Sequence, residues 1–327
     1  MSRRTIWVLG QTGLSVGLLA YLFSRIDIAQ AWHVAVGAQP LLLTAAVAQL
    51  GLQLGLAALR WQIVAAALGA RLSFGLAFRF VWIGTFFSQA LPASVGGDAV
   101  RIWLYWKQSR NHRIAIQSVV LERIVMVMAL LALVVAVQPG LAARGAPATI
   151  VVSVVLLLTG MIAALGTLIA LAPVLSKRQH WLPVKMICAM AADVRALLRA
   201  RGIAPLGLLS IAAHLNMAVT AWLIAQALAL PLTLADCIVL MPVIVLVAML
   251  PISLGGWGVR ETAAVTVLGL AGIGNAGALA LSVLIGLTAI AVSVPGALFW
   301  VVLKRRPSTV ELMEATGAND EPVRVGK

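Results

Sequence analysis

Charged side chains are scarce in this sequence, and acidic side chains are the scarcest of them. Ten aspartates and glutamates stand against 24 lysines and arginines, and only 10% of the 327 residues are charged. A soluble domain carries roughly 25% charged residues. The sequence instead has 62% hydrophobic residues and a mean hydropathy of +1.05. These values exclude a soluble core and predict an integral membrane protein.

A net charge of +14 raises the alternative of a nucleic-acid partner, but the placement of the cations excludes it. The lysines and arginines flank apolar runs, and no extended polar region is present to form a binding surface. Cysteine is also rare. Cys188 and Cys237 fall near opposite ends of a predicted span, so we expect neither a disulfide nor a metal site.

The patterns of the common catalytic sites are missing as well. The sequence has no paired carboxylate motif, no nucleophile elbow, no Ser-Lys dyad and no histidine cluster. We therefore expect no enzyme activity and no cofactor. No cleavable signal peptide is evident, because Arg3 and Arg4 precede an apolar run without a small-residue cleavage site. That run is predicted to be the first membrane span.

One pattern occurs twice in the sequence. Residues 91–101 and 250–260 both read Leu-Pro-x-Ser-x-Gly-Gly-x-x-Val-Arg. In each copy a proline (Pro92 or Pro251) ends a helix, and a glycine pair permits backbone dihedrals that other residues resist. A broken helix leaves free amides and carbonyls. Hydrocarbon tolerates such groups only where they are buried in protein or line a watery cavity.

The arginine that ends each copy, Arg101 or Arg260, would lie about one turn into the next half-helix. A cation near a helix N-terminus is unfavourable unless an anion meets both the cation and the free amides. The pattern therefore predicts an anion site at the breaks. The alternative is a glycine-rich turn between two ordinary spans, with the arginine marking the water interface.

Apolar runs of about 20 residues, the length that crosses a bilayer, predict the membrane spans. They lie near residues 5–23, 40–59, 114–137, 148–172, 203–230 and 276–303. The two repeat regions, 74–109 and 233–272, each hold two shorter apolar segments, which makes eight to ten apolar segments in all. We expect an all-α integral membrane domain at 1–303, with about six full spans and two re-entrant hairpins. A disordered polar tail should follow at 304–327.

The distribution of lysine and arginine orients these spans. Arg3 and Arg4 place the N-terminus in the cytoplasm, and the cation-rich segment 173–202 and the C-terminus belong on the same side. Residues 184–201 are amphipathic and should lie along the inner leaflet. The first hairpin would then enter from the cytoplasm and the second from outside, an inverted repeat that is typical of transporters. Ten full spans would have the same termini and keep the inversion.

Charges inside predicted spans are costly and usually functional. Glu122 and Arg123 are adjacent on a helix and do not face each other, so their partners lie elsewhere. We expect Glu122 to pair with Arg101 or Arg260, and the alternative is a purely structural buried ion pair. Polar span residues are candidates for interhelical hydrogen bonds or for substrate contacts. They are Gln49, Gln53, Gln117, His214 and Asn216.

The predicted anion site draws on both copies of the pattern. Arginines would hold a phosphate, and hydroxyls and free amides would donate hydrogen bonds. Carboxylates would balance the arginines in the empty site or contact a cationic head group. The candidate residues are Arg101, Arg260, Ser94, Ser253, Gly96, Gly97, Gly255, Gly256, Glu122, Arg123, Glu261 and Asp98, and the helix breaks are Pro92 and Pro251.

Three stretches of the sequence resemble one known family. They are Phe87–Arg101 (FSQALPASVGGDAVR), Leu121–Ile124 (LERI) and Leu250–Glu261 (LPISLGGWGVRE). Over about residues 5–303 the chain is similar to the lysylphosphatidylglycerol synthase transmembrane region, also called the flippase-like domain or UPF0104 family. The resemblance implies a lipid flippase of the bacterial inner membrane, similar to one that moves aminoacylated phosphatidylglycerol between leaflets.

In the best-known members of that family a soluble aminoacyl-transferase domain follows the membrane domain. We expect this chain to lack it, because 24 residues follow Leu303, and synthesis of a lysyl lipid is therefore not implied. Stand-alone relatives are associated with other lipids, including hopanoid and isoprenoid-linked glycolipid pathways.

Three hypotheses for the function follow. The leading one is a transporter whose partner is a lipid with an anionic head group, driven by a gradient or mass action because no ATP-binding motif is present. The second is an accessory subunit that recruits a separate lipid-synthesising enzyme without transport of its own. The third is an enzyme that uses Asp98 or Glu261 as a base.

Overall fold

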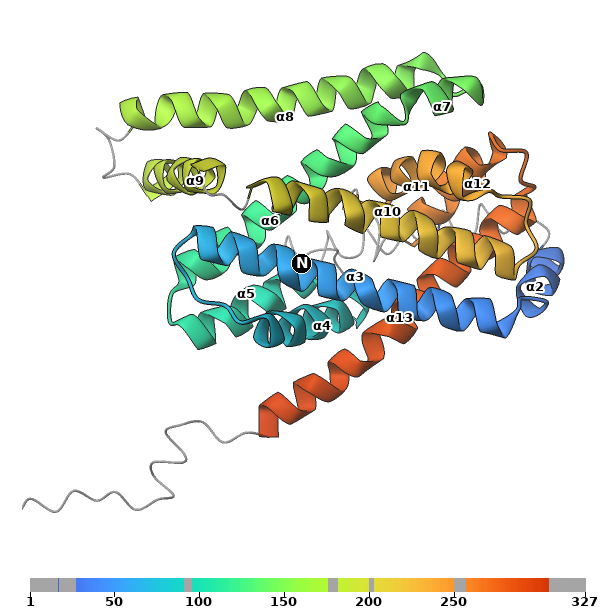
Figure 1. Ribbon diagram of the computed structural model, residues 1–327, viewed down its shortest axis with the longest axis horizontal. Coiled ribbons are helices and arrows are strands. Elements are labelled where there is room, and N and C mark those ends of the chain that lie inside the picture. The colour runs from blue at the N-terminus through green and yellow to red at the C-terminus, as the bar shows by residue number, and fades with distance from the viewer. Residues whose placement is uncertain are drawn as a thin grey trace, which may run out of the picture.

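The computed structural model describes residue 17 and residues 28–90, 96–175, 182–199, 203–249 and 257–305. Every regular element within these ranges is a helix (Figure 1). Five are long and apolar enough to cross a membrane: α3 (Pro40–Ala67), α6 (His112–Ala136), α8 (Ala148–Leu175), α10 (Ile203–Ala227) and α13 (Asn275–Arg305). Each is longer than the ~30 Å hydrocarbon core at about 1.5 Å per residue. The all-α membrane fold is confirmed, with five of the six predicted spans; the other, near 5–23, falls almost wholly outside the described residues.

The two repeat regions form pairs of shorter helices. The first pair is α4 (Phe74–Ala90) with α5 (Gly96–Ser109), and the second is α11 (Leu234–Ala248) with α12 (Val259–Gly269). The two helices of each pair pack on one another. With 11 to 17 residues, they are too short to cross the hydrocarbon core alone. These lengths favour two re-entrant hairpins over ten full spans.

The two halves of the bundle have the same order of elements (long, short, short and long) in α3–α6 and in α10–α13. The central helices α3 and α10 pack along one another (Figure 1). They are antiparallel: the amide of Gln39, just before α3, donates to the carbonyl oxygen of Ala227 at the end of α10 at 2.9 Å. At the opposite end, Val64 of α3 shares a core cluster with Leu206 of α10. The halves are therefore inverted, as the lysine and arginine distribution predicts.

The turn that leads from each central helix into its hairpin is repeated too. Gly69 (φ +76°) and Ala229 (φ +52°) both take the left-handed conformation that ends many helices. The amide that follows each of them donates at 2.9 Å to a carbonyl oxygen five residues earlier. A non-glycine residue seldom adopts a positive φ. The conformation of Ala229 therefore shows that the two halves share this backbone turn even where their sequences differ.

Three further helices are α2 (Ile28–Val36), α7 (Gln138–Ala143) and α9 (Leu182–Arg199). The last of these confirms the amphipathic helix predicted at 184–201. It packs against α8 and buries Val194 and Leu197. Its Asp193 also binds Arg113 of α6 at 3.1 Å. Burial raises the pKa of the Asp193 carboxyl in spite of this arginine, and one of its oxygens is buried without a hydrogen bond in the described structure.

Cations of the described loops and helix ends gather at one end of the bundle. In Figure 1 the end of α3, the start of α6, α9 and the end of α13 lie toward the left, whereas α2, α7 and the turn after α10 lie toward the right. The left end carries Arg71, Lys107, Arg110 and Arg113. At the other end, Arg144 after α7 forms an ion pair with Asp236 of α11.

Candidate functional site

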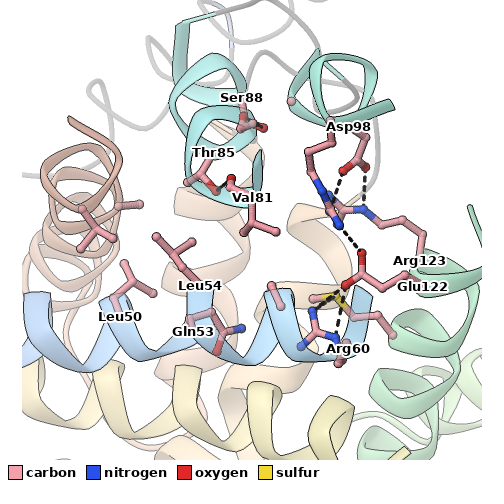
Figure 2. Close-up of a pocket in the computed structure, with 17 residues that line it drawn as sticks. Leu50, Gln53, Leu54, Arg60, Val81, Thr85, Ser88, Asp98, Glu122 and Arg123 are labelled. Atoms are coloured by element: carbon pink, nitrogen blue, oxygen red, sulfur yellow. Dashed lines mark hydrogen bonds and ion pairs between the residues drawn. The ribbon is translucent and has the colours of Figure 1, made fainter. Parts of the chain in front are cut away.

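A cavity of about 220 Å³ lies between the first hairpin, α3, α6 and α13; we call it the central cavity (Figure 2). Its walls are partly apolar, with Leu50, Leu54 and Val81 among them. Its polar lining comes from four elements: Gln53 and Arg60 of α3, Thr85 and Ser88 of α4, Asp98 and Arg101 of α5, and Glu122 and Arg123 of α6. Four charged residues that the sequence predicted for the site therefore meet in one place.

The close approach of α4 and α5 brings Asp98 and Arg101 to the cavity. The two helices meet at Gly84 and Gly97. A Cβ on Gly97 would collide with the carbonyl oxygen of Gly84 and the hydroxyl of Ser88, and a Cβ on Gly84 would lie 2.7 Å from Cγ of Arg101. Only glycine leaves room for this approach. Gly97 therefore acts through packing, and Gly96 is the first residue of α5.

The charged residues form one continuous chain of ion pairs. Arg60 Nη2 donates to Glu122 Oε1 at 2.9 Å, and Arg101 Nη2 donates to Glu122 Oε2 at 2.9 Å. Arg101 Nη1 also donates to Asp98 Oδ1 at 3.2 Å, and Arg123 Nε donates to Asp98 Oδ2 at 2.6 Å. Each carboxylate thus bridges two guanidinium groups, as the dashed lines of Figure 2 show. Glu122 pairs with Arg101 as predicted, but not with Arg260.

These charges do not cancel. Among the described residues, three guanidinium groups face two carboxylates, which leaves the central cavity one positive charge in excess. Arg60 is 2% exposed and Arg101 is 6% exposed. Nη1 of Arg60 and Nε of Arg101 are buried and make no hydrogen bond within the described structure. A buried charge is costly unless it is paired. The cavity therefore carries an uncompensated positive charge that an anion would balance.

Two tryptophan rings support the two arginines of the repeat. The guanidinium carbon of Arg101 lies 4.4 Å from the ring centre of Trp61, and that of Arg260 lies 4.8 Å from the ring centre of Trp257. A cation over an aromatic face is attracted to it. The rings therefore hold both guanidinium groups in place without neutralising them.

The sequence interpretation missed Arg60. It placed Arg60 at the cytoplasmic end of a span near 40–59, but α3 continues to Ala67 and keeps Arg60 about two turns inside the helix. The carboxylate of Glu122, 2.9 Å away, explains why a cation is tolerated there. The sequence does indicate that the helix continues past Arg60, because residues 61–67 are mostly apolar, like the rest of the helix.

The second arginine of the repeat lies in a different environment. Arg260 donates through Nη2 to Glu261 Oε1 at 2.6 Å and through Nε to Ser282 Oγ at 3.2 Å. The other oxygen of Glu261 accepts from the amide of Gly258 at 2.6 Å and caps α12. This pair is electrically neutral, and the adjoining cavity measures only about 10 Å³. In the described structure Arg260 does not line the cavity of Arg101, and its own neighbour neutralises it.

Several predicted residues lie outside the described part of the chain. They are Ser94, Ser253, Gly255 and Gly256 of the candidate site and the helix breaks Pro92 and Pro251. Their contribution stays a prediction.

The polar residues of the spans bind one another across helices. Asn216 of α10 accepts from Gln49 Nε2 at 2.7 Å and donates to Gln53 Oε1 at 3.1 Å. His214 of the same helix lies 3.0 Å from the carbonyl oxygen of Met126. Gln117 is an exception, because it accepts at 2.8 Å from Arg113 of its own helix, α6. Gln49, Gln53, His214 and Asn216 therefore contact neighbouring helices through hydrogen-bonding groups, as predicted. Gln53 also lines the central cavity. Among the described residues, no group of histidine, cysteine or carboxylate side chains is suited to hold a metal ion.

Comparison with known proteins identifies one family. The family model described as lysylphosphatidylglycerol synthase TM region matches residues 8–296, which includes both hairpins and the central cavity. A search of curated proteins finds no match.

Proposed function

Because the chain belongs to the lysylphosphatidylglycerol synthase TM region family, we propose that it moves a lipid with an anionic head group between the two leaflets of its membrane. The observation that carries the proposal is the uncompensated positive charge of the central cavity. A charge of this kind inside a membrane protein marks a substrate or ion pathway in most cases. Its place beside one hairpin of an inverted repeat is the place where transporters of this architecture bind their substrates.

The central cavity suits a head group better than a whole lipid. At about 220 Å³ it is small, while its walls combine apolar side chains with five charged ones. We propose that the phosphate enters the cavity and that the acyl chains stay in the bilayer. Arg101 and Arg60, which both line the cavity, would bind the phosphate oxygens.

The carboxylates give the site a way to stay nearly neutral in both states. When the site is empty, Glu122 and Asp98 hold the three guanidinium groups. When a phosphate with one negative charge binds, the total charge becomes zero, which lowers the cost of moving the loaded site through hydrocarbon. A cationic group on the same head group would be attracted to Asp98 or Glu122.

The inverted hairpins supply the proposed motion. The first hairpin borders the larger cavity, whereas the second borders a cavity of about 10 Å³. We propose that the two hairpins open in turn, one toward each leaflet, with a gradient or mass action as the driving force. The cation-rich end of the bundle would face the cytoplasm, as the positive-inside rule requires, in a bacterial inner membrane.

Reconstitution tests this proposal. The purified chain is placed in liposomes with a head-group-labelled phosphatidylglycerol or phosphatidylcholine, and the label in each leaflet is measured with a membrane-impermeant reductant. We expect redistribution of the anionic lipid. Arg101→Gln should lower the affinity for the anionic lipid about ten- to a hundredfold, because a hydrogen bond to a charged group usually contributes about 1.5–3 kcal/mol. Arg101→Lys should lower it less, because lysine keeps the charge but loses the planar fork.

The matched control is Arg71→Gln, which removes an exposed cation from the loop after α3. It should transport like the unmodified chain. If the unmodified chain leaves the label where empty liposomes do, the transporter proposal fails and the accessory-subunit hypothesis is favoured.

A further inference from the structure

A second cavity of about 520 Å³ lies outside the central one, between α4, the end of α5 and α13; we call it the peripheral cavity. Phe80 of α4 and Phe299 and Leu303 of α13 are among its apolar walls. Of the described residues that line it, the polar ones are Arg79 on α4 and Gln108 near the end of α5, and none is a carboxylate. The peripheral cavity therefore combines a large apolar volume with one cation and one amide.

Arg79 is suited to bind an anion from the bilayer. It is exposed and forms no ion pair with a carboxylate of the described residues. It lies five residues into a helix of the first hairpin, about 8 Å from the start. An exposed cation near a membrane surface attracts the anionic head group of a lipid. The apolar walls beside it favour a phospholipid, whose acyl chain would cover them, over a free phosphate ion.

The packed interface between α4 and α13 around Trp82, which we call the Trp82 seam, lies between the two cavities. The indole nitrogen of Trp82 donates to the carbonyl oxygen of Val292 at 2.6 Å, and Val292 lines the central cavity. The same indole ring contacts the ring of Phe299, a wall of the peripheral cavity, at 5.6 Å between centres. Gly296 lies directly against the carbonyl of Trp82, where a Cβ would collide. Trp82 thus closes the seam between the cavities.

The helix on the other side of this seam has a built-in weak point. Pro295 lies inside α13, between Val292 and Gly296. Proline has no amide hydrogen, so it removes one hydrogen bond of the helix and favours a bend. A bend there would draw Val292 away from the indole of Trp82. Opening of the seam would then break the Trp82 hydrogen bond and separate the packed faces of α4 and α13.

We infer that the peripheral cavity is the loading site of the transporter: an anionic phospholipid binds there with its phosphate at Arg79. Its head group then passes the Trp82 seam into the central cavity. This inference rests on the proposed function and adds the route by which the substrate reaches the central cavity.

Lipid binding tests the loading site without any transport. The full chain is placed in nanodiscs of zwitterionic phosphatidylcholine with increasing phosphatidylglycerol, and bound phosphatidylglycerol is counted by native mass spectrometry. Arg79→Gln should weaken the binding about fivefold, since a cation near a membrane surface contributes roughly 1 kcal/mol. Arg71→Gln removes an exposed cation that does not line the peripheral cavity, so it should weaken the binding clearly less. Equal binding by both variants, or displacement of the lipid by inorganic phosphate, overturns the loading site.

Opening of the seam is tested by access to the central cavity. A single cysteine replaces Ser88, which lines the central cavity, in a chain whose native Cys188 and Cys237 are alanine. Its alkylation by a membrane-soluble maleimide is then timed. Trp82→Phe keeps an aromatic ring but removes the hydrogen bond, which is worth about 1 kcal/mol, so alkylation should be about fivefold faster. Trp300→Phe should have no effect, and an unchanged rate in Trp82→Phe overturns the seam.

The two proposals fail separately. If the unmodified chain does not move lipid but Arg79→Gln still loses phosphatidylglycerol, transport fails and the peripheral site stands. If the chain moves lipid and Arg79→Gln neither binds nor transports differently from Arg71→Gln, transport stands and the loading route is wrong.

Discussion

Replacing Glu122 with glutamine removes the carboxylate that two buried guanidinium groups share. Glu122 is 2% exposed, and its two oxygens accept from Arg60 and Arg101 at 2.9 Å each. Glutamine has nearly the same shape but no charge. The substitution therefore changes the electrostatics of the central cavity and leaves its packing almost intact.

The expected loss of stability is large. Removing one partner of a buried ion pair costs about 3–5 kcal/mol, because the other charge is left uncompensated. Here the excess charge of the cavity would rise from one to two. Arg60→Gln in the same chain would bring it back to one. We therefore expect the double variant to recover about 2–3 kcal/mol relative to the sum of the single losses.

The free energy of unfolding is measured by denaturant titration in mixed micelles, with and without added phosphatidylglycerol. The anionic lipid should stabilise Glu122→Gln more than the unmodified chain, because the phosphate supplies the missing negative charge. Zwitterionic phosphatidylcholine is the control and should stabilise both equally. A loss below about 1 kcal/mol, or equal stabilisation by the two lipids, would refute the assignment of the central cavity as an anion site.

Three further predictions concern packing, pH and topology. Gly97→Ala should destabilise the chain by about 1–3 kcal/mol, because the added Cβ would collide with Gly84 and Ser88. Gly51→Ala is the control, since a Cβ there meets open space, and denaturant titration compares the free energies of unfolding of the two variants. The raised pKa of Asp193 means that its stabilising contribution is complete below the ordinary value of 3.8 and is lost as the pH rises through the folded pKa. Asp193→Asn should remove this part of the stability-against-pH curve, and an unchanged curve contradicts the prediction. Single cysteines at 110 and 190 should react with an impermeant reagent from inside and one at 144 from outside; outside labelling at 190 would contradict the inverted topology.

The fold was predictable because its signals are local. Runs of about 20 apolar residues mark the long helices, and the prolines and glycine pairs mark the hairpins. The end of α3 was not predicted, because a charged residue is normally a sign that a span has ended. Arg60 is an exception that only its partner on α6, 62 residues later, explains. A sequence does not show such a pairing until the helices are placed side by side.

The sequence pointed to four of the charged residues that meet in the central cavity and to the pair of Glu122 with Arg101, but not to Arg60 or to the separate place of Arg260. The repeated pattern led to Arg101 and Asp98, and the cost of charges in hydrocarbon led to Glu122 and Arg123. The matched arginines suggested one shared anion site. The structure instead neutralises Arg260 with Glu261, whose side chain also caps α12. That outcome depends on the side-chain conformation of an adjacent residue, which the spacing of the pattern does not determine.

The difference between the halves suggests what the inverted repeat is for. Three charged positions of the first half, Arg60, Asp98 and Glu122, correspond in the second half to Thr220, Trp257 and Ser282, all of them neutral. Arg60 corresponds to Thr220 because each lies nine residues before the matched turn at Gly69 or Ala229. Asp98 corresponds to Trp257 because the two repeated patterns align there. The third correspondence follows because Arg101 reaches Glu122 and Arg260 reaches Ser282 on the long helix after its hairpin. The halves therefore share their backbone and the arginine that ends each repeat, but not these three charges. A second equal binding site would need those charges, whereas a gate that moves in the opposite sense needs only the inverted backbone. The symmetry of this chain is thus better suited to alternate opening around one anion site than to two sites of equal affinity.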